Sequence, residues 1–522
     1  MTRDPLSLPE PLEISLPNST LSLSRRDLLQ GVGAAGLAAT IPNLATAATR
    51  GGDVAAIKSV VARQHDDMIR RLRDWIALPT IAAERRNLQE GAQMMSAMLT
   101  DAGFQHTEII QTPGTPAVFA TLDAGAAKTL GVYAMYDVKQ YDGPGWIAPP
   151  LEGRIVEDPD LGKIMIARGA INTKGPQMAF LAALHAIRAA GRKLPVNIVL
   201  IAEGEEEVGS VHLEEVLNKP QVAQALSRCT GMIYADAAQS PSGDVTLDLG
   251  SKGMLEVELT ASSQAWGRGA AEEVHSGYAA AIDSPVWHLV QALATMTSPD
   301  GTRVTIDGWY DDIRAPTPHE LALLAKNATP SSEESMKKIF GVRRWLNDVP
   351  YPQAVERLAN APTANIEGIY GGYTGPGGKT SLPARGVAKM DFRLVPNQTA
   401  KGAEAKLRAH LAKHGFGDID VKATGGVDPS ETREDTPLIA AVKSVYAKEG
   451  VPLTINPRNP TSGPTYLFTN PPFSLAFSSF GLGHGARFHV PNEYYVIEPK
   501  NPLLRGFDGA TSSFVELLYA LA

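Results

Sequence analysis

A run of acidic residues, Glu203-Gly204-Glu205-Glu206-Glu207-Val208-Gly209-Ser210, directly follows an apolar segment with strand character. Four carboxylates within five residues repel one another if they are held close together without a cation. At the carboxyl end of a strand in an open α/β sheet, such side chains would lie where ligands bind. The run therefore predicts a metal site with acid–base chemistry, and the alternative for an isolated run is a solvated acidic turn.

Four further segments carry residues of similar chemical type. They are Met135-Tyr136-Asp137, the segment 168–176 with Asn172, Tyr234-Ala235-Asp236, and the segment 488–493 with His489. Together with the acidic run, and in the same order, they resemble the family of di-zinc metallopeptidases that includes carnosine dipeptidase, carboxypeptidase G, aminoacylase and succinyl-diaminopimelate desuccinylase. The resemblance extends from about Ile57 to the C-terminus.

The resemblance implies catalytic roles for three residues. Glu206 aligns with the general base that takes a proton from a metal-bound water, and Asp137 with the carboxylate that orients a zinc-binding histidine. His275 aligns with the histidine of a second domain that stabilises the oxyanion, often from the partner subunit. Without the resemblance, a surface hydrogen bond is the simpler interpretation of His275.

The resemblance also implies ligand and substrate roles. Glu207 and His489 align with ligands of one zinc ion, and Asp236 aligns with a ligand of the other. Arg393 and Ser462 match positions that hold the substrate carboxylate. A salt bridge is the alternative for Arg393.

Two positions depart from the family pattern. Met135 stands where the family has its first zinc-binding histidine, and Asn172 stands where it has the aspartate that bridges both metals. A neutral thioether is a poor zinc ligand, and a neutral amide bridges two cations badly. Only Glu207, Asp236 and His489 keep a side chain that binds zinc well.

Charge counting favours one metal ion. Glu207 and Asp236 neutralise one dication but not two, whereas an empty site would force a proton onto one of the crowded carboxylates. We expect a single zinc ion per subunit, replaceable by cobalt or manganese, held by Glu207 and His489 with Asn172 or Asp236 completing the set. One zinc ion beside a glutamate base is sufficient for amide hydrolysis. A metal-free site is the alternative. His484 is either a ligand that replaces one of the lost side chains or a residue of a surface loop.

The hydropathy pattern predicts the elements that position these residues. Strands over 129–136, 196–202 and 231–235 and a helix over 174–190 predict an α/β fold, a mostly parallel sheet with helices on both faces, of the zinc-exopeptidase type. Alternating segments at 254–260 and 388–394, with a helix from Pro285, predict a smaller α+β domain. A helix over 437–449 and a strand over 473–480 then show the pattern of the first, mostly parallel sheet again.

These patterns divide the chain of 522 residues into parts. The catalytic domain is predicted over 49–250 and 424–522, with a lid or dimerisation domain inserted at 251–423. Residues 1–48, with Arg25-Arg26 before a short Gly/Ala-rich run, resemble a twin-arginine signal peptide and predict a periplasmic or secreted protein. A tail that happens to contain two arginines is the alternative.

Composition limits the partners. A net charge of −8 argues against nucleic-acid and anionic-membrane partners, because both need a basic face. The single Cys229 excludes an intramolecular disulfide framework. The expected partners are a small substrate that bears a carboxylate and, by resemblance, a second copy of the chain.

Three functions follow, in order of preference. The first is an exported metal-dependent hydrolase of C–N bonds in dipeptides or N-acyl amino acids, with Glu206 as the base. The second is a metal-independent acid–base enzyme, such as an isomerase, lyase or cyclase, which the losses at Met135 and Asn172 motivate. The third is a binding protein without catalysis, which retention of Glu206 disfavours.

Overall fold

The computed structural model describes the backbone of residues 41–522 and the side chains from Gly51 onward. The chain divides into two compact units, Met1–Asp53 and Val54–Ala522, and the description below concerns the second. Helix α1 (Ile41–Ile76) spans the boundary, and its large apolar residues from Val54 onward are buried. The export signal predicted for residues 1–48 lies almost entirely outside the described residues, so it stays a prediction.

A six-stranded sheet carries the acidic run. Its order is β1 (His106–Ile110), β2 (Ala117–Leu122), β6 (Asn197–Glu203), β3 (Thr129–Met135), β7 (Met232–Ala235) and β18 (Phe477–Phe480). The pairs β6–β3, β3–β7 and β7–β18 are parallel, and the pairs of β2 with β1 and β6 are antiparallel. The predicted mostly parallel sheet is confirmed. Its last strand is shorter than the predicted segment 473–480, because backbone hydrogen bonds close turns up to Leu475.

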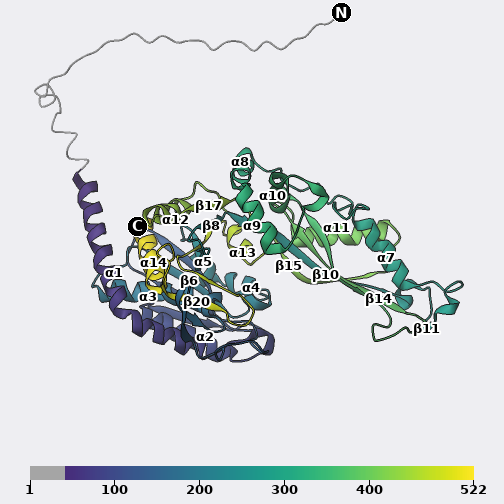
Figure 1. Ribbon diagram of the computed structural model, residues 1–522, viewed down its shortest axis with the longest axis horizontal. Helices are drawn as coiled ribbons and strands as arrows, with labels where there is room; N and C mark the ends of the chain where they lie inside the picture. Colours follow the sequence, from purple (N-terminus) through teal and green to yellow (C-terminus); the bar gives the residue numbers. More distant parts are fainter. Residues whose placement is uncertain (1–40) are drawn as a thin grey trace, which may run out of the picture. The chain divides into compact units, whose positions relative to one another are not determined.

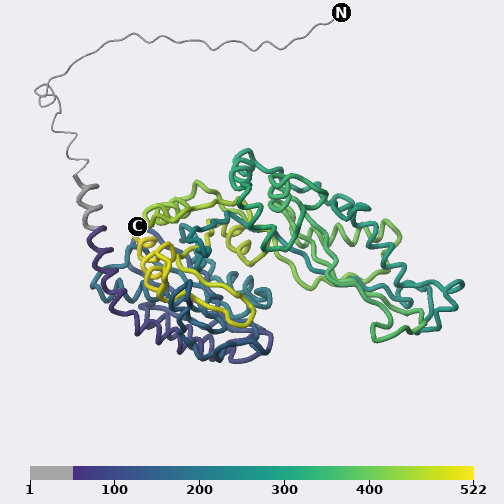
Figure 2. Tube along the Cα trace, viewed as in Figure 1, coloured from purple at the N-terminus to yellow at the C-terminus, as the bar shows by residue number. Residues whose placement is uncertain are grey.

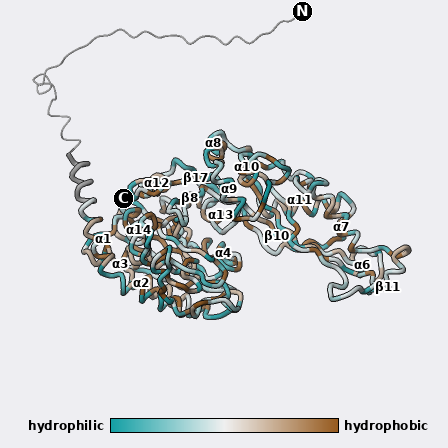
Figure 3. Tube along the Cα trace, viewed as in Figure 1, coloured by the Kyte–Doolittle hydropathy of each residue, from teal (hydrophilic) through white to brown (hydrophobic). Residues whose placement is uncertain are grey.

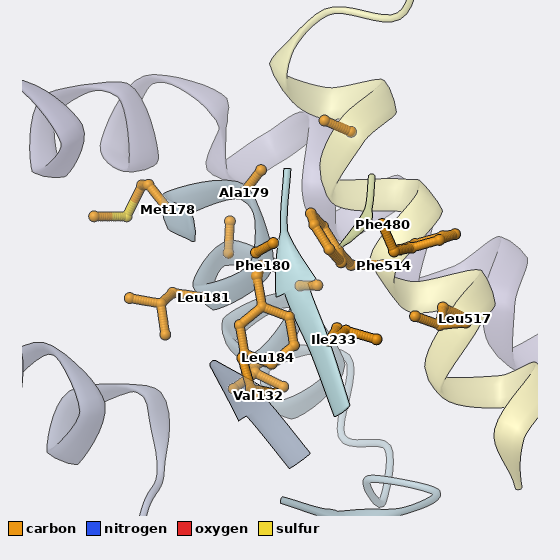
Figure 4. Close-up of a cluster of buried hydrophobic side chains, with 14 of the residues drawn as sticks. Val132, Met178, Ala179, Phe180, Leu181, Leu184, Ile233, Phe480, Phe514 and Leu517 are labelled. Atoms are coloured by element: carbon orange, nitrogen blue, oxygen red, sulfur yellow. The ribbon is translucent and has the colours of Figure 1, made fainter. Parts of the chain in front are cut away.

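Helices cover both faces of this sheet (Figure 1). Alternate residues of β3 enter different apolar clusters: Val132 packs on one face and Tyr133 on the other. The first cluster includes α3 (Gly175–Ala189), α12 (Pro437–Lys448) and α14 (Phe507–Leu521), and the second includes α4 (Leu213–Leu217) and α5 (Pro220–Leu226). Figure 4 shows Phe180 of α3 beside Ile233 of β7 in the first cluster. Burial on both faces explains why the strands read as continuous apolar runs.

A second sheet forms between β8 and the returning chain. It is antiparallel, in the order β12 (Thr363–Tyr370), β14 (Arg385–Leu394), β10 (Gly253–Ser262) and β15 (Asp420–Val427). Buried and half-buried residues alternate along β10, as its sequence predicts. Helices α7 (Pro285–Met296) and α11 (Ala400–Lys413) pack on this sheet around an apolar cluster of their own. The domain boundaries themselves stay a prediction.

The C-terminal segment returns to the first sheet. In Figure 2 its yellow trace lies beside the blue N-terminal part, consistent with the pairing of β18 with β7 and the packing of α14 on α3. A third sheet, β19 (Gly485–Ala486), β20 (Tyr494–Pro499), β5 (Gly162–Ile166) and β4 (Arg154–Asp158), joins the His489 loop to the segment that leads into Asn172. Buried Arg168 and Glu493 pair across this junction at 2.5 Å.

The other α-helices and β-strands of the described residues are mostly short. They are α2 (Leu88–Ala102), β8 (Val245–Asp248), β9 (Gly250–Ser251), α6 (Ser263–Trp266), β11 (Val274–His275), α8 (Pro318–Asn327), α9 (Pro330–Phe340), α10 (Tyr351–Asn360), β13 (Ser381–Leu382), β16 (Ser430–Glu431), β17 (Leu453–Asn456) and α13 (Tyr466–Thr469). Hydrophobic and hydrophilic residues are interspersed along the trace (Figure 3). None of the helices between residues 41 and 522 is both long and apolar enough to cross a bilayer.

Candidate functional site

The ends of three parallel strands define the site. Met135 at the end of β3 pairs with Glu203 at the end of β6, and β7 ends beside them at Ala235. Because parallel strands place their carboxyl ends at one edge of a sheet, the residues that follow converge there. This register is why Asp137, the acidic run and Asp236 converge on one edge of the sheet.

Two of the four carboxylates of the acidic run have partners of their own. Glu203 is buried and accepts a hydrogen bond from the Tyr133 hydroxyl at 2.6 Å, and burial raises its pKa to about 8. Glu205 accepts from the Thr115 amide at 2.8 Å and contacts His212 Nδ1 at 2.7 Å. The run is therefore not one cluster of four charges in need of a cation, and only Glu206 and Glu207 are left for the chemistry.

Glu207 is the centre of the site. Its Oε1 lies 2.7 Å from Asn172 Nδ2, which is also 3.0 Å from His489 Nε2, and its Oε2 lies 3.3 Å from the same His489 nitrogen. Its backbone amide donates to Asp137 Oδ2 at 3.0 Å. The structure thus brings together four residues predicted from the sequence, with the Asn172 amide group between the carboxylate and the imidazole.

Lys139 is a member of the site that the sequence did not single out. Its ammonium lies 3.3 Å from Glu207 Oε2 and also donates to the Glu207 carbonyl oxygen. It therefore supplies positive charge to a carboxylate that the resemblance assigns to a cation. A single lysine two residues after Asp137 belongs to no recognisable sequence motif. Only the spatial arrangement identifies Lys139 as part of the site.

The residues at the positions that the resemblance assigns to a second metal contact other groups of the chain. The Tyr234 hydroxyl donates to Met135 Sδ at 3.2 Å, and the Ala237 amide donates to Asp236 Oδ1 at 2.7 Å. Burial raises the pKa of Asp236. Oδ1 of buried Asp137 has no hydrogen-bond partner in the described part of the chain, and burial raises the pKa of Asp137 well above its usual range. An imidazole at position 135, which the family resemblance implies, is the donor that this orphaned oxygen lacks.

These contacts decide how many metal ions the residues fit. Glu207, His489 and Asp236 do not form a trio whose ligand atoms all lie within 4.8 Å of one another, and within residues 51–522 only a group elsewhere does. A second ion beside Met135 and Asn172 would have Asp236 as its only charged ligand, because a thioether and an amide are neutral, so the residues present do not fit it. One divalent ion fits at Glu207 and His489, with Asn172 offering a carbonyl oxygen, provided that it displaces the contacts of the Asn172 amide nitrogen.

His484 is not a replacement ligand in this structure. It is only 3% exposed, its Nδ1 lies 2.9 Å from the Gln239 carbonyl oxygen, and its Nε2 lies 3.1 Å from the Tyr494 hydroxyl. Both ring nitrogens are therefore engaged in holding the loop after β18.

Glu206 lines a cavity of about 290 Å³ together with Tyr133, Tyr234 and Ser462. Burial, and then the neighbouring charge of Glu207, raise the pKa of Glu206 to about 7, and Lys139 opposes that shift. A carboxylate with a pKa near neutrality is suited to general-base catalysis.

The substrate-binding pair comes from two different parts of the chain. Arg393 at the end of β14 donates through Nη1 to Ser462 Oγ at 3.1 Å, and through Nε to Asp391 at 2.9 Å. Ser462 lines the Glu206 cavity, so Arg393 is one hydrogen bond away from a residue of its lining. The predicted salt bridge and the predicted substrate role are therefore both compatible with this geometry.

His275 lies apart from these contacts. It is exposed, accepts a hydrogen bond from the Gly277 amide at Nδ1 (3.0 Å) and contacts Thr380 Oγ1 through Nε2 (3.3 Å). No contact between His275 and the Glu207 group occurs among the described residues, so its predicted catalytic role stays a prediction.

Comparison with known proteins identifies the family. Residues 132–503 match peptidase family M20/M25/M40. The chain belongs to this family. It is 27% identical to the human Beta-Ala-His dipeptidase over 73% of this chain and 76% of that protein, and 25% identical to the Cys-Gly metallodipeptidase of Schizosaccharomyces pombe over 68% and 74%. The M20 family metallo-carboxypeptidase Sso-CP2 from Sulfolobus solfataricus superposes with a TM-score of 0.76 at 30% identity, covering 87% of this chain and 99% of that one.

Membership confirms three predictions: the family, the α/β fold class and the assignment to the hydrolases. Metallopeptidases of this family use divalent metal ions, typically zinc. The substitution of two family ligands by Met135 and Asn172 rests on the sequence resemblance and stays a prediction.

Restoring the two ligands is expected to restore the second metal position. In Met135→His/Asn172→Asp, the imidazole gains Asp137 as a partner and the carboxylate can bridge two ions. We expect about one additional zinc ion per chain relative to the wild type, measured by elemental analysis after equilibrium dialysis. The surface variant Asn347→Asp adds the same charge and should leave the stoichiometry unchanged. Unchanged stoichiometry in the double variant would contradict this account of the site.

Proposed function

We propose that the chain hydrolyses the C–N bond of small carboxylate-bearing substrates, such as dipeptides or N-acyl amino acids, with Glu206 as the general base. The observation that carries this proposal is Glu206 itself, half-buried in a cavity with a pKa raised to about 7. A chain that only binds its ligand has no need of such a group. The named substrates of the relatives, β-alanyl-histidine and cysteinyl-glycine, belong to the same chemical class.

The residues around Glu206 hold it for this task. The Asp137 carboxylate anchors the backbone of the turn that carries Glu206 and Glu207, because it accepts from the Glu207 amide. Lys139 holds the other side of the turn through the Glu207 carbonyl oxygen. With its turn anchored at two points, Glu206 is positioned to take a proton from a water molecule at the scissile bond and to return it to the leaving nitrogen.

Arg393 and Ser462 bind the carboxylate end of the substrate in this proposal. The guanidinium offers a fork of donors that matches a carboxylate, and Asp391 fixes its orientation through Nε. Binding of the substrate carboxylate beside Ser462 would place the neighbouring amide bond in the Glu206 cavity.

Glu207 and His489 would hold one divalent ion, zinc in the first instance, with cobalt or manganese as substitutes. An ion bound there supplies a Lewis acid, which polarises a carbonyl group and lowers the pKa of a coordinated water to about 7. It would have to compete with the ammonium of Lys139 and the amide of Asn172 for the Glu207 carboxylate.

Glu206→Gln tests the base. It keeps the shape of the side chain but removes its proton affinity, so we expect kcat to fall by roughly 10²- to 10⁴-fold with little change in KM. The measurement is steady-state hydrolysis of a panel of dipeptides and N-acyl amino acids by zinc-loaded protein. Glu214→Gln, an exposed glutamate on α4, is the matched control. Equal rates for Glu206→Gln and the wild type on a substrate that the wild type hydrolyses would refute the role.

A metal-independent acid–base enzyme is the second candidate. It is favoured by the Asn172 amide and the Lys139 ammonium, which already satisfy Glu207 as a cation would. Exhaustive chelation separates the candidates: the hydrolase should lose its activity and regain it with zinc, whereas the metal-independent enzyme should keep its activity.

We also propose that the chain forms a homodimer through its second sheet. Strand β12 is an edge strand and exposes Ile366, Ile369 and Tyr370, and Trp287 on α7 is 67% exposed. Apolar side chains along an unpaired strand edge are typical of an interface. In such a dimer, His275 would serve the active site of the partner.

Ile369→Glu is expected to dissociate this dimer, because it places a charge in the apolar edge. Light scattering coupled to size-exclusion chromatography should show a dimer for the wild type and a monomer for the variant. The control Ile339→Glu, at a more exposed isoleucine on α9, should remain dimeric. A monomeric wild type would remove the basis for the trans role of His275.

We propose export through the twin-arginine route from the sequence alone. The basis is the pair Arg25-Arg26 and the short Gly/Ala-rich run that follows it. Replacing both arginines by lysine keeps the charge and should retain the protein in the cytoplasm, measured by cell fractionation of a bacterial host. Replacing Arg3 by lysine should have no effect. Export of the double variant at the wild-type level would contradict the proposal.

A further inference from the structure

A second cluster of metal-binding side chains lies on the second sheet, outside the site described above. His410 and His414 are one turn apart at the C-terminal end of α11, with ring centroids 4.2 Å apart, and both face Asp307 (for the helix, Figure 1). Asp307 Oδ2 lies 2.9 Å from His414 Nε2 and 3.2 Å from His410 Nδ1. One ligand atom from each residue lies within 4.8 Å of the other two.

The tautomer of His410 is set by its neighbours. The Thr295 hydroxyl donates its proton to the Ala292 carbonyl oxygen at 2.7 Å, so it must accept a proton from His410 Nε2, 2.9 Å away. If the ring is neutral, its Nδ1 then carries a lone pair. Burial, followed by the nearby His414, lowers the pKa of His410 and favours the neutral ring.

This tautomer directs the lone pair of His410 Nδ1 toward Asp307. The lone pair accepts a hydrogen bond from the Asp307 amide at 3.2 Å, and Oδ2 of the same residue lies 3.2 Å from Nδ1, so an ion bound there would replace the amide as the partner of the lone pair. A histidine whose far N–H is held by an oxygen has its ring orientation fixed, as metal-binding histidines do. The Thr295 hydroxyl is the partner that orients the ring.

The three residues are also held on rigid elements. His410 is 1% exposed within the apolar cluster of α11, whereas Asp307 and His414 are exposed and leave room for water as a further ligand. Fully buried Trp309, two residues after Asp307, anchors its loop, and the Trp309 carbonyl oxygen accepts from Gln398. The site is therefore formed before any ion binds.

Lys413 is the competing cation. Its ammonium lies 3.2 Å from Asp307 Oδ2, and its side chain is 67% exposed, so it can move into solvent when an ion takes its place. Two imidazoles and one carboxylate suit zinc, and they do not suit calcium or magnesium, which prefer oxygen ligands alone.

We propose that Asp307, His410 and His414 form a zinc site that ties the loop after α7 to helix α11. The bound ion would stabilise the second sheet and its helices, because a ligand that binds only the folded state raises its stability. This site is independent of the proposed hydrolysis, and its test does not use activity.

The test uses Zn²⁺ and Co²⁺ with full-length protein carrying His489→Gln, so that metal at Glu207 does not contribute. In this background we expect zinc binding by calorimetry, a rise in the unfolding temperature with zinc, and visible absorption from tetrahedral Co²⁺. Adding His414→Gln, an exposed change that spares the core, should weaken zinc binding by more than about tenfold and abolish the Co²⁺ band. Adding Lys413→Gln instead should strengthen binding roughly two- to fivefold.

Two results would overturn the proposal. One is no zinc binding by the His489→Gln protein at about 1 mM zinc. The other is equal zinc affinity with and without His414→Gln, which would place the ion elsewhere. Circular dichroism of each variant establishes that a loss of binding is not a loss of folding.

Discussion

The parallel pairing of β3 with β6 and β7 is the constraint on which the site depends. It sets Met135 beside Glu203 and ends all three strands at one edge, so the segments that follow are forced into one small volume. The sheet is covered by apolar clusters on both faces, so these carboxylates lie where water is scarce. Desolvation then raises the pKa values of Glu203, Glu206 and Asp236. Hydrogen bonds to Glu203 and Asp236 oppose this rise, whereas at Glu206 the charge of Lys139 opposes it.

Neighbouring side chains compensate the charge of the Glu207 carboxylate. Its carboxylate is surrounded by an amide nitrogen, an imidazole and an ammonium group, all supplied by the chain itself. A buried carboxylate without any positive partner would take up a proton instead. Compared with the bridging aspartate that the resemblance implies at this position, Asn172 has one negative charge fewer and one donor more, which reduces the need for two dications. The same change leaves Glu206 and its cavity in place, so the loss concerns the metal more than the base.

The second sheet contributes in two separate ways. One end of β14 carries Arg393 to Ser462 and so to the Glu206 cavity. On the same sheet, the apolar cluster beneath α11 holds His410 rigid and leaves one ring nitrogen facing Asp307. An antiparallel sheet with one buried face suits both tasks. Every second side chain of a strand packs in the apolar cluster and fixes the strand, while the strand ends and the covering helices carry the functional side chains.

Much of the fold could be predicted from the spacing of apolar residues along the sequence. The strands ending at Met135, Glu203 and Ala235, the helix from Gly175 and the alternating strands of the second sheet lie where the sequence predicts them. The strand before Phe480 was predicted too long, because its apolar residues continue through turns that precede the strand. Apolar content alone does not separate a buried turn from a buried strand.

For the site, the sequence by itself determined which residue types are available. It identified Glu206, Glu207, Asp137, Asn172, Asp236 and His489, and by resemblance it predicted that two ligand positions are substituted. Only the tertiary structure decided what those residues contact: that Glu203 and Glu205 have their own donors, that Lys139 neutralises Glu207, and that His484 is engaged by Gln239 and Tyr494. The zinc cluster of Asp307, His410 and His414 likewise joins residues about a hundred positions apart. The physical reason is that hydrogen bonds and charges act over a few ångströms in space, whereas spacing along the chain specifies only the local elements.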